Sequence, residues 1–317
     1  MDVRRTNYGF IQSSSSTHLP KNTSIAIYIG GKWNFESPVQ IEHNGASLFV
    51  TTLGTGPDVI LLHPTPVHHA FWLPVAELLA DRYRLTLLDL RGHGKSSLGA
   101  GEAAIAMGML ADDTHAVLQA LQIEHAAFVG CSIGSYTLYE YWRRFPQEMA
   151  ALVITCGKPQ PDTEANREKR RESMHAAQQP GGLQKFFDQT ADTLVGPTAK
   201  RLHPDIRAAA RAMMDGFSLE AMLAVQQGLM QRPDSVPTLK TIHVPICALA
   251  GGEDQGSTTA EMHIIAEQAP RAEFHLLQDA GHYAPLEQPQ NVATLIADFL
   301  DREYRPRHSV RAARKAH

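Results

Sequence analysis

The chain has 317 residues, of which 43% are hydrophobic and 20% charged, a balance that suits one large globular domain with room for an inserted subdomain. Its 29 basic and 33 acidic residues give a formal net charge of −4, which argues against nucleic acid or an anionic membrane as the main partner.

Two further features concern where the protein works. No apolar run approaches the length of a membrane span, and no apolar segment of the secretory type follows Arg4-Arg5. The cysteines Cys131, Cys156 and Cys247 lie in or beside apolar segments, without C-x-x-C spacing, which predicts buried free thiols. We therefore predict a cytoplasmic protein.

The first part of the chain combines a polar extension with a hairpin. Residues 1–37 include Ser13-Ser14-Ser15-Ser16 and are predicted to be a flexible extension, in which only residues 25–29 could pair as an edge strand. Residues 39–43 and 47–53 flank Asn44-Gly45, a strong signal for a β-hairpin.

The next segments alternate between two patterns. Continuous apolar runs at 58–63, 83–89, 126–129 and 149–155 are typical of strands buried on both faces. Helical spacing of apolar residues lies between them, at 71–80, 109–121 and 136–145. This alternation predicts an α/β protein with a doubly wound, mostly parallel sheet, in which ligands bind beyond the carboxyl ends of the strands.

The pattern changes after residue 156. Residues 157–239 are polar and helical and contain no strand candidate, which predicts an inserted helical cap over the strand ends. We interpret the charge run at 167–172 as a solvated helix face, and the Met and Phe residues of this segment as helix packing.

The alternation then resumes, with strands predicted at 243–250 and 272–277 and helices at 260–269 and 285–300. The α/β core is therefore predicted at 38–156 and 240–303. It is followed at 304–317 by a basic tail that we interpret as disordered.

One glycine-rich motif, Gly130-Cys131-Ser132-Ile133-Gly134, stands between a predicted strand and a predicted helix. Small residues allow a sharp turn there, which strains the serine backbone and exposes its hydroxyl. The N–H of the following isoleucine lies at a helix N-terminus, where a developing oxyanion is favoured. Taken alone, the motif also fits a turn that merely caps a helix.

Two more candidate groups follow later strands. Asp254 comes after Gly251-Gly252, and His282 follows a short Ala-Gly turn. A serine hydroxyl needs a base to remove its proton, and the base needs a carboxylate that orients it and stabilises its charge. Histidine suits the first task and aspartate the second, with Glu253 as an alternative acid.

The other histidines near strand ends have weaker claims. His63 is predicted to pack beneath its loop, and His93 to belong to a structural loop. His68 and His69 fit either a pocket or a solvent-exposed loop, and because no third ligand stands at suitable spacing, no metal site is predicted.

These motifs, in this order, resemble the α/β-hydrolase fold superfamily over about residues 39–300. The loop 89–96 resembles a structural motif of the same family, and Glu287-x-Pro289 resembles the segment after its histidine. The elbow and the early cap are most similar to 3-oxoadipate enol-lactonase-like esterases and lactonases.

The resemblance implies a serine hydrolase that cleaves a carboxylic ester or lactone through an acyl-enzyme and requires no cofactor. The implied catalytic residues are Ser132, Asp254 and His282. The implied oxyanion hole consists of the N–H groups of Thr65 and Ile133. The family usually has His-Gly where this chain has a proline after the histidine, but the donor comes from the next residue.

The expected substrate pocket includes His68, Trp72 and Cys131. A carbon–carbon bond hydrolase, thioesterase or acyltransferase would use the same triad, and a non-hydrolytic tailoring enzyme or a ligand-binding sensor also stays open. A serine at the elbow argues against dehalogenases and epoxide hydrolases, which need a carboxylate there. The expected partner is a small-molecule substrate, with neither nucleic acid nor a membrane, and a homodimer stays open.

Overall fold

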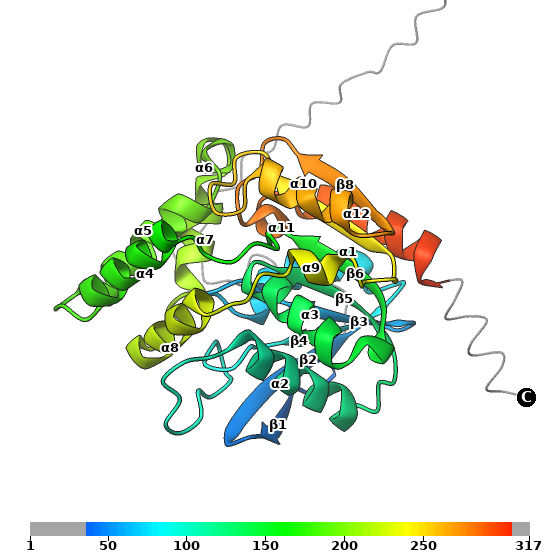
Figure 1. Ribbon diagram of the computed structural model, residues 1–317, viewed down its shortest axis with the longest axis horizontal. Coiled ribbons are helices and arrows are strands. Elements are labelled where there is room, and N and C mark those ends of the chain that lie inside the picture. The colour runs from blue at the N-terminus through cyan, green and yellow to red at the C-terminus, as the bar shows by residue number, and fades with distance from the viewer. Residues whose placement is uncertain (1–35, 306–317) are drawn as a thin grey trace, which may run out of the picture. The chain divides into compact units, whose positions relative to one another are not determined.

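An eight-stranded sheet organises residues 36–305, the part of the chain that the computed structural model describes (Figure 1). The strand order is β1-β2-β4-β3-β5-β6-β7-β8. β2 pairs antiparallel with β1 and β4, and every other pair is parallel. The strands are β1 (Val39–His43), β2 (Ala46–Leu53), β3 (Asp58–Leu62), β4 (Arg84–Leu88), β5 (Ala126–Cys131), β6 (Met149–Thr155), β7 (Ile246–Gly251) and β8 (Ala272–Leu277). The predicted mostly parallel, doubly wound sheet is confirmed.

Helices cover this sheet and bury its central strands. The helices outside the insertion are α1 (Leu73–Leu79), α2 (Met107–Ala120), α3 (Ile133–Arg144), α10 (Thr259–Gln268), α11 (Ala284–Glu287) and α12 (Pro289–Glu303). α2 packs beside α3, and α1 packs beside α12. Every residue of β5 is buried, as expected for an uninterrupted apolar run in the middle of a parallel sheet.

The end of the core differs from the prediction. The single helix expected at 285–300 is two helices, α11 and α12, which are separated at Gln288. Pro289 excludes the helical conformation for the residue before it, and Gln288 accordingly adopts φ −134° and ψ 60°. The break lets the chain turn immediately after the loop that carries His282.

The segment between β6 and β7 contains helices but no strand among its described residues. These helices are α4 (Glu164–Ala177), α5 (Gly182–Leu194), α6 (Pro197–Leu202), α7 (Pro204–Ala212), α8 (Leu219–Met230) and α9 (Val236–Leu239). We call residues 157–239 the helical insertion. Figure 1 shows α4, α5, α7 and α8 gathered beyond one end of the sheet, whereas α9 packs on α3 and α10.

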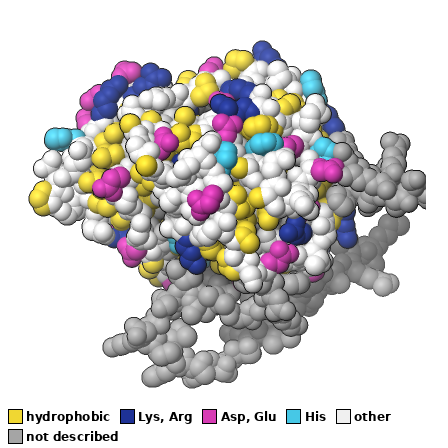
Figure 2. Space-filling model, turned by 90° about the horizontal axis from the view of Figure 1, so that it is seen from below, with side chains coloured by type: hydrophobic (Ala, Val, Ile, Leu, Met, Phe, Trp, Pro, Cys, Tyr) yellow, Lys and Arg dark blue, Asp and Glu magenta, His cyan; other side chains and the backbone are white. Residues whose placement is uncertain are grey.

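The surface carries mixed charge. On the face seen in Figure 2, acidic and basic side chains are interspersed rather than separated by sign, consistent with the nearly balanced composition. Within residues 36–305, no helix combines the length and apolar character that a membrane span needs. The expectations for residues 1–35, including the short strand at 25–29, and for the tail from 306 onward lie outside the described residues.

Two histidines are built into the core as neutral groups. His63 accepts a hydrogen bond from the Leu90 N–H at Nε2 (2.9 Å) and donates from Nδ1 to the Pro64 carbonyl (2.8 Å). His93 lies beside it, with Nδ1 3.0 Å from the Arg91 carbonyl. Burial lowers the pKa of His63 to about 3 and that of His93 to about 4.

The two histidines predict an acid-sensitive fold. Below pH 6.5 these histidines bind protons in the unfolded chain but stay neutral in the native state. The free energy of unfolding therefore falls as the pH drops toward 4. Each histidine removes up to about 1.4 kcal/mol per pH unit in that window. In urea unfolding at pH 7.0 and 5.5, His93→Gln should lose less stability between the two conditions than the wild type. The exposed His263→Gln is the matched control, and a loss in His93→Gln equal to that of the wild type would refute the linkage.

Candidate active site

The turn between β5 and α3 holds Ser132 in a backbone conformation that few side chains adopt. Its φ is 52° and its ψ is −115°. A Cβ on Gly134 would lie 2.3 Å from the Leu62 carbonyl oxygen, and one on Gly130 would lie 2.7 Å from the backbone of Gly134. Only glycine at both positions therefore lets α3 start this close to β3 and β5. The predicted strand–turn–helix is confirmed in its geometry.

Asp254 and His282 meet beyond the ends of β7 and β8. Nδ1 of His282 lies 2.8 Å from Oδ2 of Asp254, and both residues are buried. The other carboxylate oxygen accepts hydrogen bonds from the N–H groups of Gly256 (2.7 Å) and Ser257 (3.1 Å). The carboxylate is thus fixed on both sides, and it holds the imidazole with Nε2 turned away from it.

Electrostatics favour the charged form of this pair. Burial by itself would raise the pKa of Asp254, but the attraction of His282 and the hydrogen bonds to the carboxylate outweigh it, so that pKa is lowered. Burial by itself would lower the pKa of His282, but the charge of Asp254 outweighs it and raises that pKa. An imidazolium formed during a reaction would therefore be stabilised.

A cavity of about 570 Å³ opens onto Ser132, His282 and Thr65. Thr65 is held by two groups: its carbonyl accepts a hydrogen bond from the Tyr283 hydroxyl (3.2 Å), and its Oγ1 lies 2.9 Å from Nε2 of His93. Within the described residues, neither its N–H nor that of Ile133 makes a hydrogen bond. Both N–H groups that the sequence analysis assigned to the oxyanion hole are therefore available to bind a ligand.

The supporting roles of Tyr283 and His93 were not found from the sequence. His93 was assigned to a structural loop, and it lies in that loop, but its ring reaches Thr65 and also stacks on Phe217 of the insertion (centroids 4.6 Å apart). The sequence feature that could have indicated a role for Tyr283 is its position directly after His282.

Glu253, the alternative acid, points elsewhere. Its carboxylate accepts hydrogen bonds from the N–H (3.0 Å) and hydroxyl (2.6 Å) of Thr198, at the start of α6. Glu253 therefore binds the insertion, and Asp254 faces the histidine.

Glu287 fastens the histidine loop. This buried carboxylate accepts hydrogen bonds from the N–H groups of Gly281 (2.8 Å), Tyr283 (3.2 Å) and Gly196 (3.1 Å). Burial is the largest influence on the carboxyl group and raises its pKa to about 7. The resemblance had placed Glu287 in the histidine segment, and its contacts show how it ties that segment to the insertion.

The three residues expected in the substrate pocket, His68, Trp72 and Cys131, do not border the cavity. Trp72 and Cys131 are fully buried. Cys131 is the last residue of β5, and its side chain does not face the cavity. It contacts the backbone carbonyl of His282 instead. Trp72 packs edge-on against Phe71 in the core.

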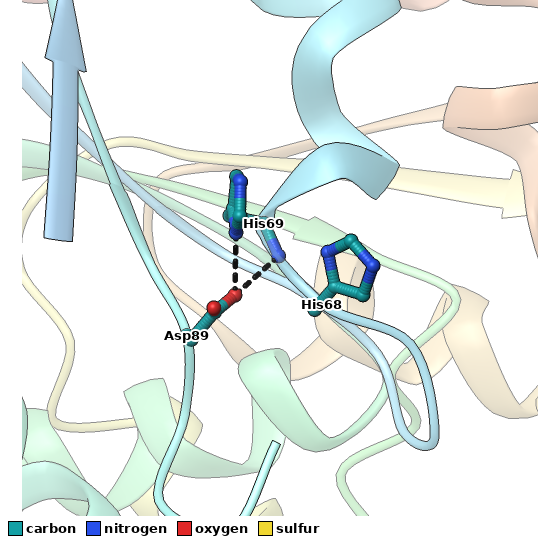
Figure 3. A group of neighbouring side chains, drawn as sticks. All are labelled: His68, His69 and Asp89. Atoms are coloured by element: carbon teal, nitrogen blue, oxygen red, sulfur yellow. Dashed lines mark hydrogen bonds and ion pairs between the residues drawn. The ribbon is translucent and has the colours of Figure 1, made fainter. Parts of the chain in front are cut away.

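His68 and His69 do have an acidic neighbour that spacing along the chain concealed. Asp89, at the end of β4, lies beside them (Figure 3). Its Oδ1 accepts hydrogen bonds from the N–H (2.6 Å) and Nδ1 (2.8 Å) of His69, and its Oδ2 accepts one from the Lys95 N–H (2.9 Å). Figure 3 shows the His68 ring lying apart from this carboxylate. Asp89 is thus committed to joining two loops.

Much of the cavity wall comes from the insertion and was not identified in the sequence. The polar residues there include Lys158, Asp162, Arg170, Gln226 and Arg232. The charge run at 167–172 is therefore not entirely a solvated face. Successive residues are rotated by about 100° around a helix, so Lys169, Arg170 and Glu172 border the cavity whereas Glu168 and Arg171 lie outside it and are exposed.

We expect Asp254→Asn to lower the rate of any reaction that uses His282 as a base by about 10³–10⁴, because an amide stabilises neither the required tautomer nor the imidazolium. Glu253→Gln is the matched control. It removes a neighbouring carboxylate whose hydrogen bonds, among the described residues, go to Thr198 and not to His282, and it should cost less than about tenfold. Steady-state kinetics on one ester distinguish the two variants, and a larger loss in the control would reassign the acid.

Comparison with known proteins places this arrangement in context. The alpha/beta hydrolase fold family model matches residues 57–289. A pimeloyl-[acyl-carrier protein] methyl ester esterase of Methylococcus capsulatus is 28% identical over 262 residues, which cover 80% of this chain and 98% of the relative. A 3-oxoadipate enol-lactonase of Acinetobacter baylyi is 26% identical over 236 residues, covering 74% of this chain and 85% of the relative. A solved thermophilic esterase from Thermogutta terrifontis, with malate bound, has a TM-score of 0.78 at 27% identity, over 85% of this chain and 100% of that one.

Proposed function

The chain belongs to the alpha/beta hydrolase fold family, and from this we propose that it is a serine hydrolase that cleaves a carboxylic ester or lactone of a small to medium organic molecule. The observation that carries the proposal is the Asp254–His282 pair, whose histidine borders the same cavity as a backbone-strained Ser132. The relatives named as esterases and an enol-lactonase support the choice of bond.

In the proposed mechanism, the Ser132 hydroxyl oxygen attacks the substrate carbonyl while Nε2 of His282 takes its proton. The N–H groups of Thr65 and Ile133 bind the oxyanion that forms. The imidazolium then gives its proton to the leaving alkoxide, which leaves an acyl-enzyme. Water, deprotonated by His282, releases the acid and restores the serine. These steps need no cofactor.

The insertion is proposed to act as a cap that selects the substrate, since it supplies most of the polar side chains in the cavity wall. His282 is itself anchored to the insertion, because its backbone N–H donates to the Leu194 carbonyl at the end of α5 (2.9 Å).

Labelling with a fluorophosphonate probe tests the nucleophile. The wild type should be labelled, and Ser132→Ala should lose both labelling and ester hydrolysis. Ser135→Ala is the control from the same turn, because the Ser135 hydroxyl is buried and donates to the Gly130 carbonyl (2.9 Å). This control should still be labelled. Labelling that persists in Ser132→Ala would reject the proposal, and labelling without turnover of a broad panel of esters and lactones would favour a ligand-binding sensor.

The pH dependence tests the base. Only neutral His282 can accept the proton, so kcat/KM should fall as the pH is lowered through its pKa. Because Asp254 raises that pKa, Asp254→Asn should shift the acid limb of the profile to lower pH while reducing the plateau. A profile that keeps its position in this variant would show that the pair does not set the titration.

A further inference from the structure

The polar wall of the cavity holds an excess of positive charge. Its cationic residues are Lys158, Lys169, Arg170 and Arg232, and its carboxylates are Asp162 and Glu172. Lys169 and Glu172 are exposed, so water screens them. Lys158 is neutralised by Glu261, which lies 2.7 Å away. The balance in the interior therefore depends on the remaining three groups.

Asp162, Arg170 and Arg232 form a network in which one carboxylate pairs with two guanidinium groups. Oδ2 of Asp162 lies 2.6 Å from Nε of Arg170, and Oδ1 lies 2.7 Å from Nη1 of Arg232. Burial by itself would raise the pKa of Asp162, but the two arginines outweigh it and lower the pKa, so the carboxylate is charged. The network carries one net positive charge.

Both arginines have donors that the protein does not use. The Nε–H of Arg232, whose side chain is only 3% exposed, is buried without an acceptor in the described part of the chain. Arg170 uses Nε for Asp162 and Nη1 for the Gln226 side chain (2.7 Å), and its Nη2 makes no hydrogen bond to the described residues. A buried donor without an acceptor is destabilising, and this applies to the Arg232 Nε–H. The Arg170 side chain is 26% exposed, so its Nη2 can reach a ligand in the cavity.

The network lies close to the proposed nucleophile. The Arg232 guanidinium stands 4.5 Å above the centre of the Tyr136 ring. Tyr136 follows Ser132 by one helical turn, and its N–H donates to the Ser132 carbonyl (3.0 Å). Ser132, Arg170 and Arg232 all border the same cavity, so one substrate can contact the serine and the arginines together.

We infer that the substrate carries a carboxylate remote from its reacting ester or lactone carbonyl, and that Arg170 and Arg232 bind this carboxylate inside the cavity. The inference rests on the proposed hydrolase function. A carboxylate supplies the single negative charge that the network lacks, and its two oxygens match the donor spacing of guanidinium groups. Such a molecule is a half-ester of a dicarboxylic acid, an acylated hydroxy acid or a lactone with an acidic side chain.

Two matched substrate pairs test the inference by proton release. Monomethyl adipate and methyl hexanoate differ by a carboxylate on the acyl side, and 6-acetoxyhexanoate and hexyl acetate differ on the alcohol side. In at least one pair, the anionic ester should have a kcat/KM at least tenfold higher than its neutral partner. The absence of any anionic preference in both pairs would overturn the inference.

The variants locate the binding site. Arg170→Gln and Arg232→Gln should each reduce the preference for the anionic ester at least tenfold. Arg171→Gln, on the same helix but exposed and outside the cavity wall, should leave it unchanged. Circular dichroism checks folding, and if Arg232→Gln does not fold, Arg170→Gln decides. A preference that survives in the folded variants overturns the assignment.

Binding separates this inference from the hydrolase proposal. In Ser132→Ala, calorimetry should detect hexanoate but not hexanamide, and adding Arg170→Gln should weaken hexanoate binding at least tenfold. This result would stand even if no ester were hydrolysed. Equal binding of hexanoate and hexanamide, or hexanoate binding that is indifferent to Arg170→Gln, would overturn the inference independently of catalysis.

Discussion

The close approach of β3, β5 and α3 is the constraint on which the site depends. The missing side chains at Gly130 and Gly134 let the helix begin directly above the Leu62 carbonyl. Ser132 takes a positive φ there, and the first N–H of α3 has no acceptor among residues 36–305. A single packing requirement thus exposes the hydroxyl and leaves free a donor beside it. The cost of the strained residue, of order 1–3 kcal/mol, is offset by the packing around it, which includes β5, buried along its whole length.

A second layer of contacts surrounds the reacting groups. Asp254 is fixed by two backbone amides, and Thr65 is fixed by Tyr283 and His93. These contacts are directional and at least partly buried, so each is worth more than a comparable one at the surface. They come from loops at several strand ends, and the register of the parallel strands brings those loops together.

The sequence predicted the sheet well because the sheet depends on local patterns, and it named the candidate triad, which stays a prediction, from equally local motifs. Apolar runs show which strands are buried, and the Gly-x-Ser-x-Gly turn has a steric reason that can be read without a structure. The break before Pro289 was equally local and was overlooked. The cavity wall was not predictable in the same way, because Arg170 and Arg232 come together only around Asp162. Asp89 was missed beside His68 and His69 because the pairing of β3 with β4 brings their following loops together, which spacing along the chain does not show.

The contacts at the end of α5 limit how the helical insertion can be exchanged by protein engineering. The Leu194 carbonyl accepts the backbone N–H of His282, and Gly196 shares the Glu287 carboxylate with the histidine loop. A Cβ on Gly196 would lie 2.7 Å from the Gly281 nitrogen, so the two segments are in contact with no room between them. The insertion is therefore not a detachable module. A chimera that exchanges it for the cap of another protein would have to carry residues 194–196 over unchanged, or the histidine would lose the frame that orients it.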